Sequence, residues 1–81
     1  MEDPVIKRGK TAIQSIVFEK QSWSRNEAYI WLKKHMFKPC EMIEEHSTLN
    51  YILRPVSIFH SFLSESLNNG IYIIIGTYCD Y

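Results

Sequence analysis

The sequence has few glycines, few cysteines and no long hydrophobic run, and each shortage excludes a class of protein. Only three of the 81 residues are glycine, so the chain has no glycine-rich loop of the kind that cradles phosphates. The longest apolar run, residues 71–75, is much shorter than the ~18 residues that a membrane span requires. We therefore expect neither a phosphate-binding loop nor a membrane partner.

Cysteine is scarce as well. Cys40 and Cys79 lie far apart, and no second pair of cysteines accompanies them, so a zinc site is not expected. Two acids occupy the first four positions and no apolar segment follows, so we expect no secretory signal and an intracellular location. In a reducing compartment both cysteines are predicted to be free, half-buried thiols.

Residues in matched catalytic roles are also missing. His35, His46 and His60 show no metal-ligand spacing with one another or with the cysteines. Residues 44–46, Glu-Glu-His, resemble an acid–base cluster, but adjacent residues of a strand point to opposite faces and do not share a site. No Gly-x-Ser-x-Gly motif marks a nucleophile. We expect a non-enzymatic protein with no catalytic or metal-binding residues and no cofactor.

Apolar side chains, by contrast, are abundant. The composition is 46% hydrophobic and 14% aromatic with a net charge of zero, which is too apolar for a disordered chain. A length of 81 residues accommodates one domain. Residues 1–10 contain Pro4, Gly9 and several charges but little to bury, so we predict a flexible N-terminal arm there and a single domain at residues 11–81.

The clearest local signal is a helix at residues 25–36. Ser24 and Glu27 have the spacing of a capping box, in which each side chain accepts a hydrogen bond from the other's backbone N–H. Trp23 occupies the staple position before the cap. The residue before Pro39 disfavours helical backbone, so the helix is not expected to pass Lys38. The apolar stripe of this helix, spaced i, i+3, i+4 and i+7, consists of Ala28, Trp31, Leu32 and His35.

Four segments have the pattern of strands, at residues 11–18, 40–45, 49–53 and 71–78. Residues 68–70, Asn-Asn-Gly, predict a turn before the last strand, because Asn and Gly, here Gly70, tolerate positive φ. Gly76 is a predicted bulge or close-approach point. Residues 56–67 fit helical or extended spacing, and we expect a short helix or loop there. The predicted fold class is α+β: a small, mainly antiparallel sheet with one principal helix packed on one face, in the order strand, helix, strand, strand, uncertain segment, strand.

Charge is unevenly distributed along the chain. Residues 5–38 hold eight basic and two acidic side chains, whereas residues 39–81 hold one basic and five acidic side chains. The two halves can steer a partner or a second copy, or they can neutralise each other within one fold. A solvated helix face with a charged tail is the alternative to DNA binding. If DNA is bound, the phosphate contacts are predicted to be Lys7, Arg8, Lys10, Arg25, Lys33, Lys34 and Lys38.

The aromatic residues point to protein contacts. The chain has two Trp, five Tyr and four Phe, more than one short helix and a small sheet can fully cover. Exposed apolar surface is common on small domains, but aromatic side chains are also enriched at the centres of interfaces. We expect self-association, with a homodimer as the first candidate.

Residues 23–38, from Trp23 and Ser24 through Ala28, Trp31 and Leu32 to His35, Phe37 and Lys38, resemble a motif of a small viral domain. That domain occurs in head-morphogenesis genes of tailed phages and among virion proteins of large DNA viruses such as marseilleviruses. The final strand after Gly70 is similar too, whereas Leu53-Arg54-Pro55 stands where phage versions often carry a more basic stretch. The resemblance implies no catalytic residues.

Two hypotheses follow from the residues and the resemblance together. The first is a non-enzymatic viral accessory or virion protein that acts through protein–protein contacts, with a second copy or with other viral proteins, in the host cell and in the virion. The alternative is a small DNA-binding protein that packages or organises a viral genome.

Overall fold

The computed structural model describes residues 10–78, which form the predicted α+β fold with an antiparallel sheet and one α-helix. Apart from Lys10, the expected arm at residues 1–10 lies outside this range, as does Cys79. The sheet has five strands, one more than the four predicted. The elements are β1 (Thr11–Glu19), α2 (Arg25–Lys34), β2 (Glu41–Glu44), β3 (Thr48–Ile52), the 3₁₀ turn η1 (Val56–Ile58), β4 (Phe59–Ser66) and β5 (Ile71–Tyr78).

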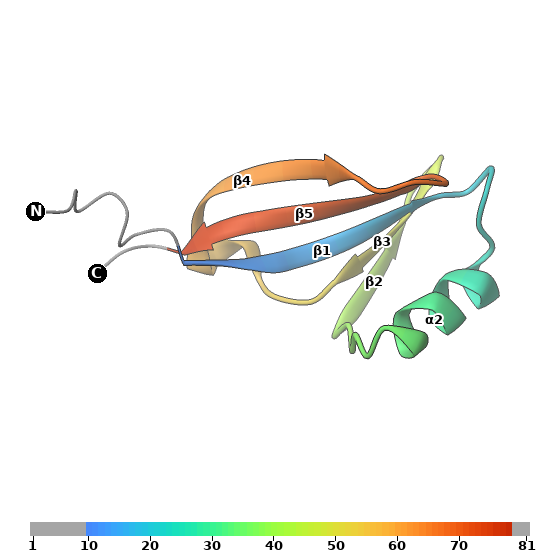
Figure 1. The fold of residues 1–81 in the computed structure, drawn as a ribbon, viewed down its shortest axis with the longest axis horizontal. Coiled ribbons are helices and arrows are strands. Elements are labelled where there is room, and N and C mark those ends of the chain that lie inside the picture. Colours follow the sequence, from blue (N-terminus) through green and yellow to red (C-terminus); the bar gives the residue numbers. More distant parts are fainter. Residues whose placement is uncertain (1–9, 79–81) are drawn as a thin grey trace, which may run out of the picture.

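The strands lie in the order β2-β3-β1-β5-β4, and every neighbouring pair is antiparallel. The first strand of the chain is therefore the central strand, paired with β3 on one side and with the last strand on the other. Figure 1 shows α2 packed beneath one end of the sheet, while β4 and β5 extend beyond it. β3 and β4 lie on opposite sides of the β1–β5 pair. Residues 53–58, which connect β3 to β4, must therefore cross both β1 and β5.

The helix begins where the sequence predicts. Ser24 Oγ accepts a hydrogen bond from the Glu27 N–H at 3.1 Å, and Glu27 Oε1 accepts one from the Ser24 N–H at 3.0 Å, which completes the capping box. Trp23 Nε1 donates to the Asn69 carbonyl at 2.6 Å, so the start of α2 is tied to the β4–β5 turn. Gly70 in that turn has the expected positive φ of 77°.

The helix ends earlier than predicted, at Lys34 rather than residue 36. Met36 has a φ of 65°, and its N–H donates to the Lys33 carbonyl, while the Phe37 N–H donates to the Leu32 carbonyl at 2.9 Å. These two bonds form a Schellman motif, which usually has glycine at the left-handed position. The sequence offered no such signal, because Met36 is not a residue that favours this conformation.

The core lies between α2 and the sheet. On the helix only Ala28 and Leu32 are buried, and Trp31, expected at the centre of the stripe, is half-buried at its side. The Trp31 ring packs edge-on against Phe18 at 5.6 Å and stacks on the exposed His35 at 4.0 Å. The buried residues of this cluster are Ile16, Phe18, Ala28, Leu32, Leu49, Tyr51 and Ile71.

The expectation for residues 56–67 is wrong. Only Val56–Ile58 form a short 3₁₀ turn, and Phe59–Ser66 form β4, an edge strand paired with β5. Pairing with β5 supplies backbone hydrogen-bond partners that the local sequence cannot predict. This pairing outweighs the weak helical spacing of the serine-rich segment.

Candidate interaction surfaces

β4 is the most exposed element of the sheet. It pairs only with β5, so among the described residues its outer edge has no partner strand. Seven of its eight residues are exposed, whereas none of the residues of β5 is. Phe62 is 48% exposed and Leu63 is 61% exposed. β4 therefore presents unpaired backbone groups together with large apolar side chains.

The two ends of β4 are held firmly. At the start, the Phe59 ring is 6% exposed and lies directly over the backbone of Gly76, which confirms the predicted close approach there. The same ring packs against Tyr78 at 5.0 Å and Phe62 at 5.8 Å. At the end, the Leu67 N–H donates to the Ile71 carbonyl at 2.8 Å. A bulge between Phe59 and Ser61 leaves Ser61–Ser66 as the regular part of the strand.

Exposed apolar residues gather in and around this strand. Nine large hydrophobic residues of the described chain are exposed, and five of them lie within the 12 residues from position 56 to position 67. Two of the five lie in β4 and the other three flank it. Such a concentration in one segment is typical of a contact surface, because scattered single residues are the ordinary pattern. We refer to these five as the β4 patch: Val56, Ile58, Phe62, Leu63 and Leu67.

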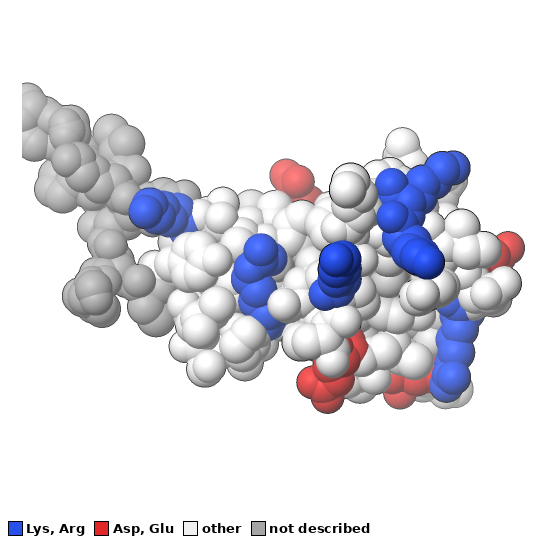
Figure 2. All heavy atoms as spheres, turned by 90° about the horizontal axis from the view of Figure 1, so that it is seen from below, with Lys and Arg blue, Asp and Glu red and all other residues white. Residues whose placement is uncertain are grey.

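The predicted phosphate-contacting residues are only partly brought together. Lys7 and Arg8 lie outside the described residues, and Lys10 is exposed at the start of β1. Lys and Arg side chains are spread along the face seen in Figure 2 rather than gathered into one cluster. The remaining members of the set, all exposed, are Arg25, Lys33, Lys34 and Lys38.

Lys38 has a neighbour that the sequence analysis did not include among these residues. Lys38 and Arg54 line the same hollow of about 560 Å³, together with the apolar residues Ile13, Phe37 and Leu53. Arg54 is held in place because its guanidinium donates to the Ile13 carbonyl at 2.6 Å. The hollow thus brings two cationic side chains together with several apolar ones.

Arg25 forms an ion pair with Glu44. Its Nε donates to Glu44 Oε1 at 2.9 Å, and the Lys20 ammonium lies 2.7 Å from the other carboxylate oxygen. Hydrogen bonds from Lys20 and then from Arg25 lower the pKa of Glu44 to about 2. The hydrogen bond to Glu44 in turn raises the pKa of Arg25. No sequence pattern identifies this cluster, because Glu44 lies 19 residues from Arg25 and farther still from Lys20 along the chain.

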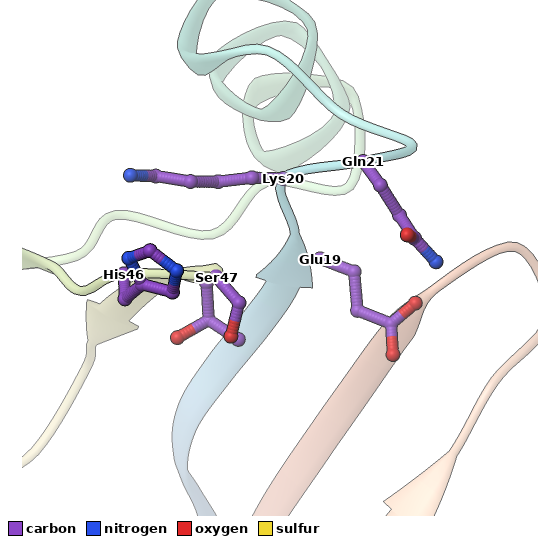
Figure 3. Close-up of a pocket in the computed structure, with 6 residues that line it drawn as sticks. Glu19, Lys20, Gln21, His46 and Ser47 are labelled. Carbon is purple, nitrogen blue, oxygen red and sulfur yellow. The ribbon is translucent and has the colours of Figure 1, made fainter.

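A second hollow, of about 380 Å³, lies where β1 ends beside the β2–β3 turn (Figure 3). Glu19, Lys20, His46 and Ser47 line it, but two of these side chains are engaged elsewhere. Glu19 accepts a hydrogen bond from the Tyr72 hydroxyl at 2.7 Å, which raises the pKa of Tyr72. Lys20 pairs with Glu44. The arrangement contains no nucleophile–base pair.

The remaining chemistry of the described residues is sparse. Residues 10–78 contain no group of three or more His, Cys, Asp or Glu side chains that could hold a metal ion. Within the same residues, no helix has the length and apolar character to cross a membrane. Cys40 is a free thiol, as expected, but it is exposed rather than half-buried, because it lies in the loop just before the edge strand β2.

Comparisons with family models, with curated proteins and with solved structures find no match to this chain. The resemblance to the viral domain at residues 23–38 therefore stays a prediction.

Proposed function

We propose that this protein is non-enzymatic and works through protein–protein contacts, of which self-association is the first. The observation that carries the proposal is the β4 patch on an unpaired strand edge. Backbone groups on such an edge can pair with another chain, and Phe62 and Leu63 add apolar surface beside the edge on the two opposite faces of the strand. The motif at residues 23–38 supports a viral setting, as an accessory or virion protein that acts in the host cell and the virion.

Light scattering coupled to size exclusion tests the proposal directly. The purified chain has a mass of 9.6 kDa, so a dimer has twice that mass and separates clearly from the monomer. We expect a dimer at micromolar concentration that dissociates on dilution. A strictly monomeric species at every concentration would refute self-association.

DNA binding is a second candidate, favoured by the hollow that Lys38 and Arg54 share. Together with exposed Lys33 and Lys34, these side chains offer cations for phosphates, and the aromatic Phe37 lines the same hollow. On this candidate the protein helps to package or organise a viral genome.

A mobility-shift titration at two salt concentrations separates the two candidates. For duplex DNA, each phosphate contact contributes about 0.9 to the slope of log K against log salt. Replacing Lys33, Lys34 and Lys38 by Ala should lower both affinity and slope, and Lys7, Arg8 and Lys10 can be replaced in the same way to test the arm. Arg25→Ala is the matched control, because Glu44 already neutralises Arg25. No shift of DNA at low salt would exclude this candidate.

A further inference from the structure

We infer that two copies of this chain pair through β4 in antiparallel orientation, with Leu63 at the two-fold axis, so that two five-stranded sheets become one sheet of ten strands. The inference rests on the self-association proposed above and adds the surface, the symmetry and the register. Its partner is a second copy because an antiparallel strand edge is complementary to itself under a two-fold rotation.

The hydrogen bonds of the β4–β5 hairpin determine which backbone groups face outward. The Leu67 N–H donates to Ile71, and residues of an antiparallel pair alternate between hydrogen-bonded and non-hydrogen-bonded positions. Along the regular register from Ser66 to Phe62, Leu63 therefore directs its backbone groups toward β5. Phe62 and Ser64 direct their N–H and C=O groups toward the open edge. These are the donors and acceptors available to a second strand.

Apart from the bulge at its start, between Phe59 and Ser61, β4 lacks the features that usually protect an edge. Lysine, arginine and proline block unwanted pairing in many proteins, and β4 contains none of them. Its one acidic residue is Glu65. The opposite edge of the sheet, β2, is only four residues long and has an acid at each end, Glu41 and Glu44. Within residues 10–78, the sheet therefore has one short edge with acids at its ends and one edge that is open along Ser61–Ser66.

Symmetry and the bulge limit the register to a centre at Leu63 or at Ser64, and the side chains decide between them. A two-fold axis perpendicular to the sheet keeps each side chain on its own face, so two residues that lie opposite each other must point to the same face. Because faces alternate along a strand, the residue numbers of such a pair are both odd or both even. Centring on Leu63 keeps Ser61 through Glu65 of both copies within the regular part of β4. Leu63 then lies opposite the partner's Leu63, and Phe62 lies opposite the partner's Ser64. The outward backbone groups of Phe62 and Ser64 bond each other in both directions.

The same register suits the side chains. The most exposed apolar residue of the strand, Leu63, meets its own copy at a non-hydrogen-bonded position, where side chains approach most closely. On the other face the two Phe62 rings are diagonal neighbours, within reach of aromatic contact. Glu65 lies opposite the partner's Ser61, and the two Glu65 carboxylates are about 13 Å apart along the strands. At that separation physiological salt screens their repulsion.

Charge substitution at the axis tests the inference. In the dimer, Leu63→Lys places two like charges directly opposite each other, and we expect the dissociation constant to rise at least about tenfold. The matched control is Ile43→Lys, which changes an exposed apolar residue on the other edge strand and should leave the dimer intact. Leu63→Glu alone should also be monomeric. Mixing the Lys and Glu variants should restore a mixed dimer, because position 63 faces itself.

Disulfide trapping tests the register. In a chain with Cys40 and Cys79 replaced by Ser, Leu63→Cys should cross-link on mild oxidation, since Cα atoms of a non-hydrogen-bonded pair lie about 4.5 Å apart, within disulfide range. Phe62→Cys should not cross-link, because diagonal neighbours are about 7–8 Å apart. Cross-linking through position 62 but not through position 63 would refute the register.

The outcomes distinguish this inference from the proposed function. A dimer that survives Leu63→Lys, with unchanged circular dichroism, would overturn pairing through β4 and leave self-association standing. A wild-type chain that is monomeric at every concentration would overturn both. Loss of the dimer in Leu63→Lys with the fold retained, intact Ile43→Lys and a restored mixed dimer are the expected results.

Discussion

Gly76→Ala should destabilise the protein although it adds only one methyl group. Gly76 has ordinary strand backbone, so alanine introduces no conformational strain there. A Cβ atom at this position would, however, overlap Cγ and Cδ1 of Phe59 and come within 2.8 Å of its Cδ2. Phe59 is held between Tyr78 and Phe62, so its ring has little room to move. Overpacking of this kind costs about 1–3 kcal/mol.

The sign of the effect should reverse when the ring is absent. In a Phe59→Ala background the added methyl group meets no ring, and alanine in a strand is more favourable than glycine by about 0.5–1 kcal/mol. The two substitutions should therefore couple by about 1.5–4 kcal/mol. Urea denaturation of the wild type, the two single variants and the double variant measures this coupling from four unfolding free energies.

A specific result would refute this reasoning. If Gly76→Ala destabilises both backgrounds equally, the close approach of the Phe59 ring is not the cause. Phe59→Ala itself should cost about 3–5 kcal/mol. The free energy of unfolding of a domain is roughly 0.05–0.15 kcal/mol per residue. The four unfolding free energies are therefore best measured at low temperature, where Phe59→Ala stays folded.

Four further predictions concern α2 and its surroundings. Ser24→Ala should cost about 0.5–2 kcal/mol in urea denaturation, and equal stability would contradict the capping box. Leu32→Ala should cost about 2–5 kcal/mol, against almost no change for exposed Tyr29→Ala. Met36→Gly should stabilise by about 1 kcal/mol, because it relieves the left-handed backbone. Because the pKa of Glu44 is lowered to about 2 in the folded state, its ionised carboxylate stabilises the fold above pH 4.5, and this stabilisation is lost as the pH falls toward about 2. In Glu44→Gln, the free energy of unfolding should therefore fall less steeply between pH 4.5 and about 2 than in the wild type.

The parts of the fold that sequence predicts well are those with local causes. The capping box at Ser24 and Glu27 lies within four residues, and both of its hydrogen bonds form as expected. Gly70 adopts a positive φ because it belongs to a turn that joins neighbouring strands. The helix end at Met36 is equally local but unusual in residue type, so its Schellman motif could not be anticipated.

The parts that sequence misses have distant causes. β4 is a strand because β5 lies beside it, and its residues alone fit a helix nearly as well. Its position at the edge of the sheet depends on β1 taking the central place between β3 and β5, which is a property of the whole chain order. The open edge could therefore not be predicted, although the aromatic surplus pointed to some exposed contact surface.

The charge distribution illustrates the same difference between sequence and structure. Along the chain, a basic half precedes an acidic half, but the fold brings Lys20 and Arg25 of the first onto Glu44 of the second. Part of the predicted polarity is thus neutralised internally. The cations that stay exposed near the end of α2, Lys33, Lys34 and Lys38, belong to the helix and its exit, whereas the β4 patch contains no charge. Protein contacts and DNA contacts would therefore use different elements, so a variant in one surface can test its own function without disturbing the other.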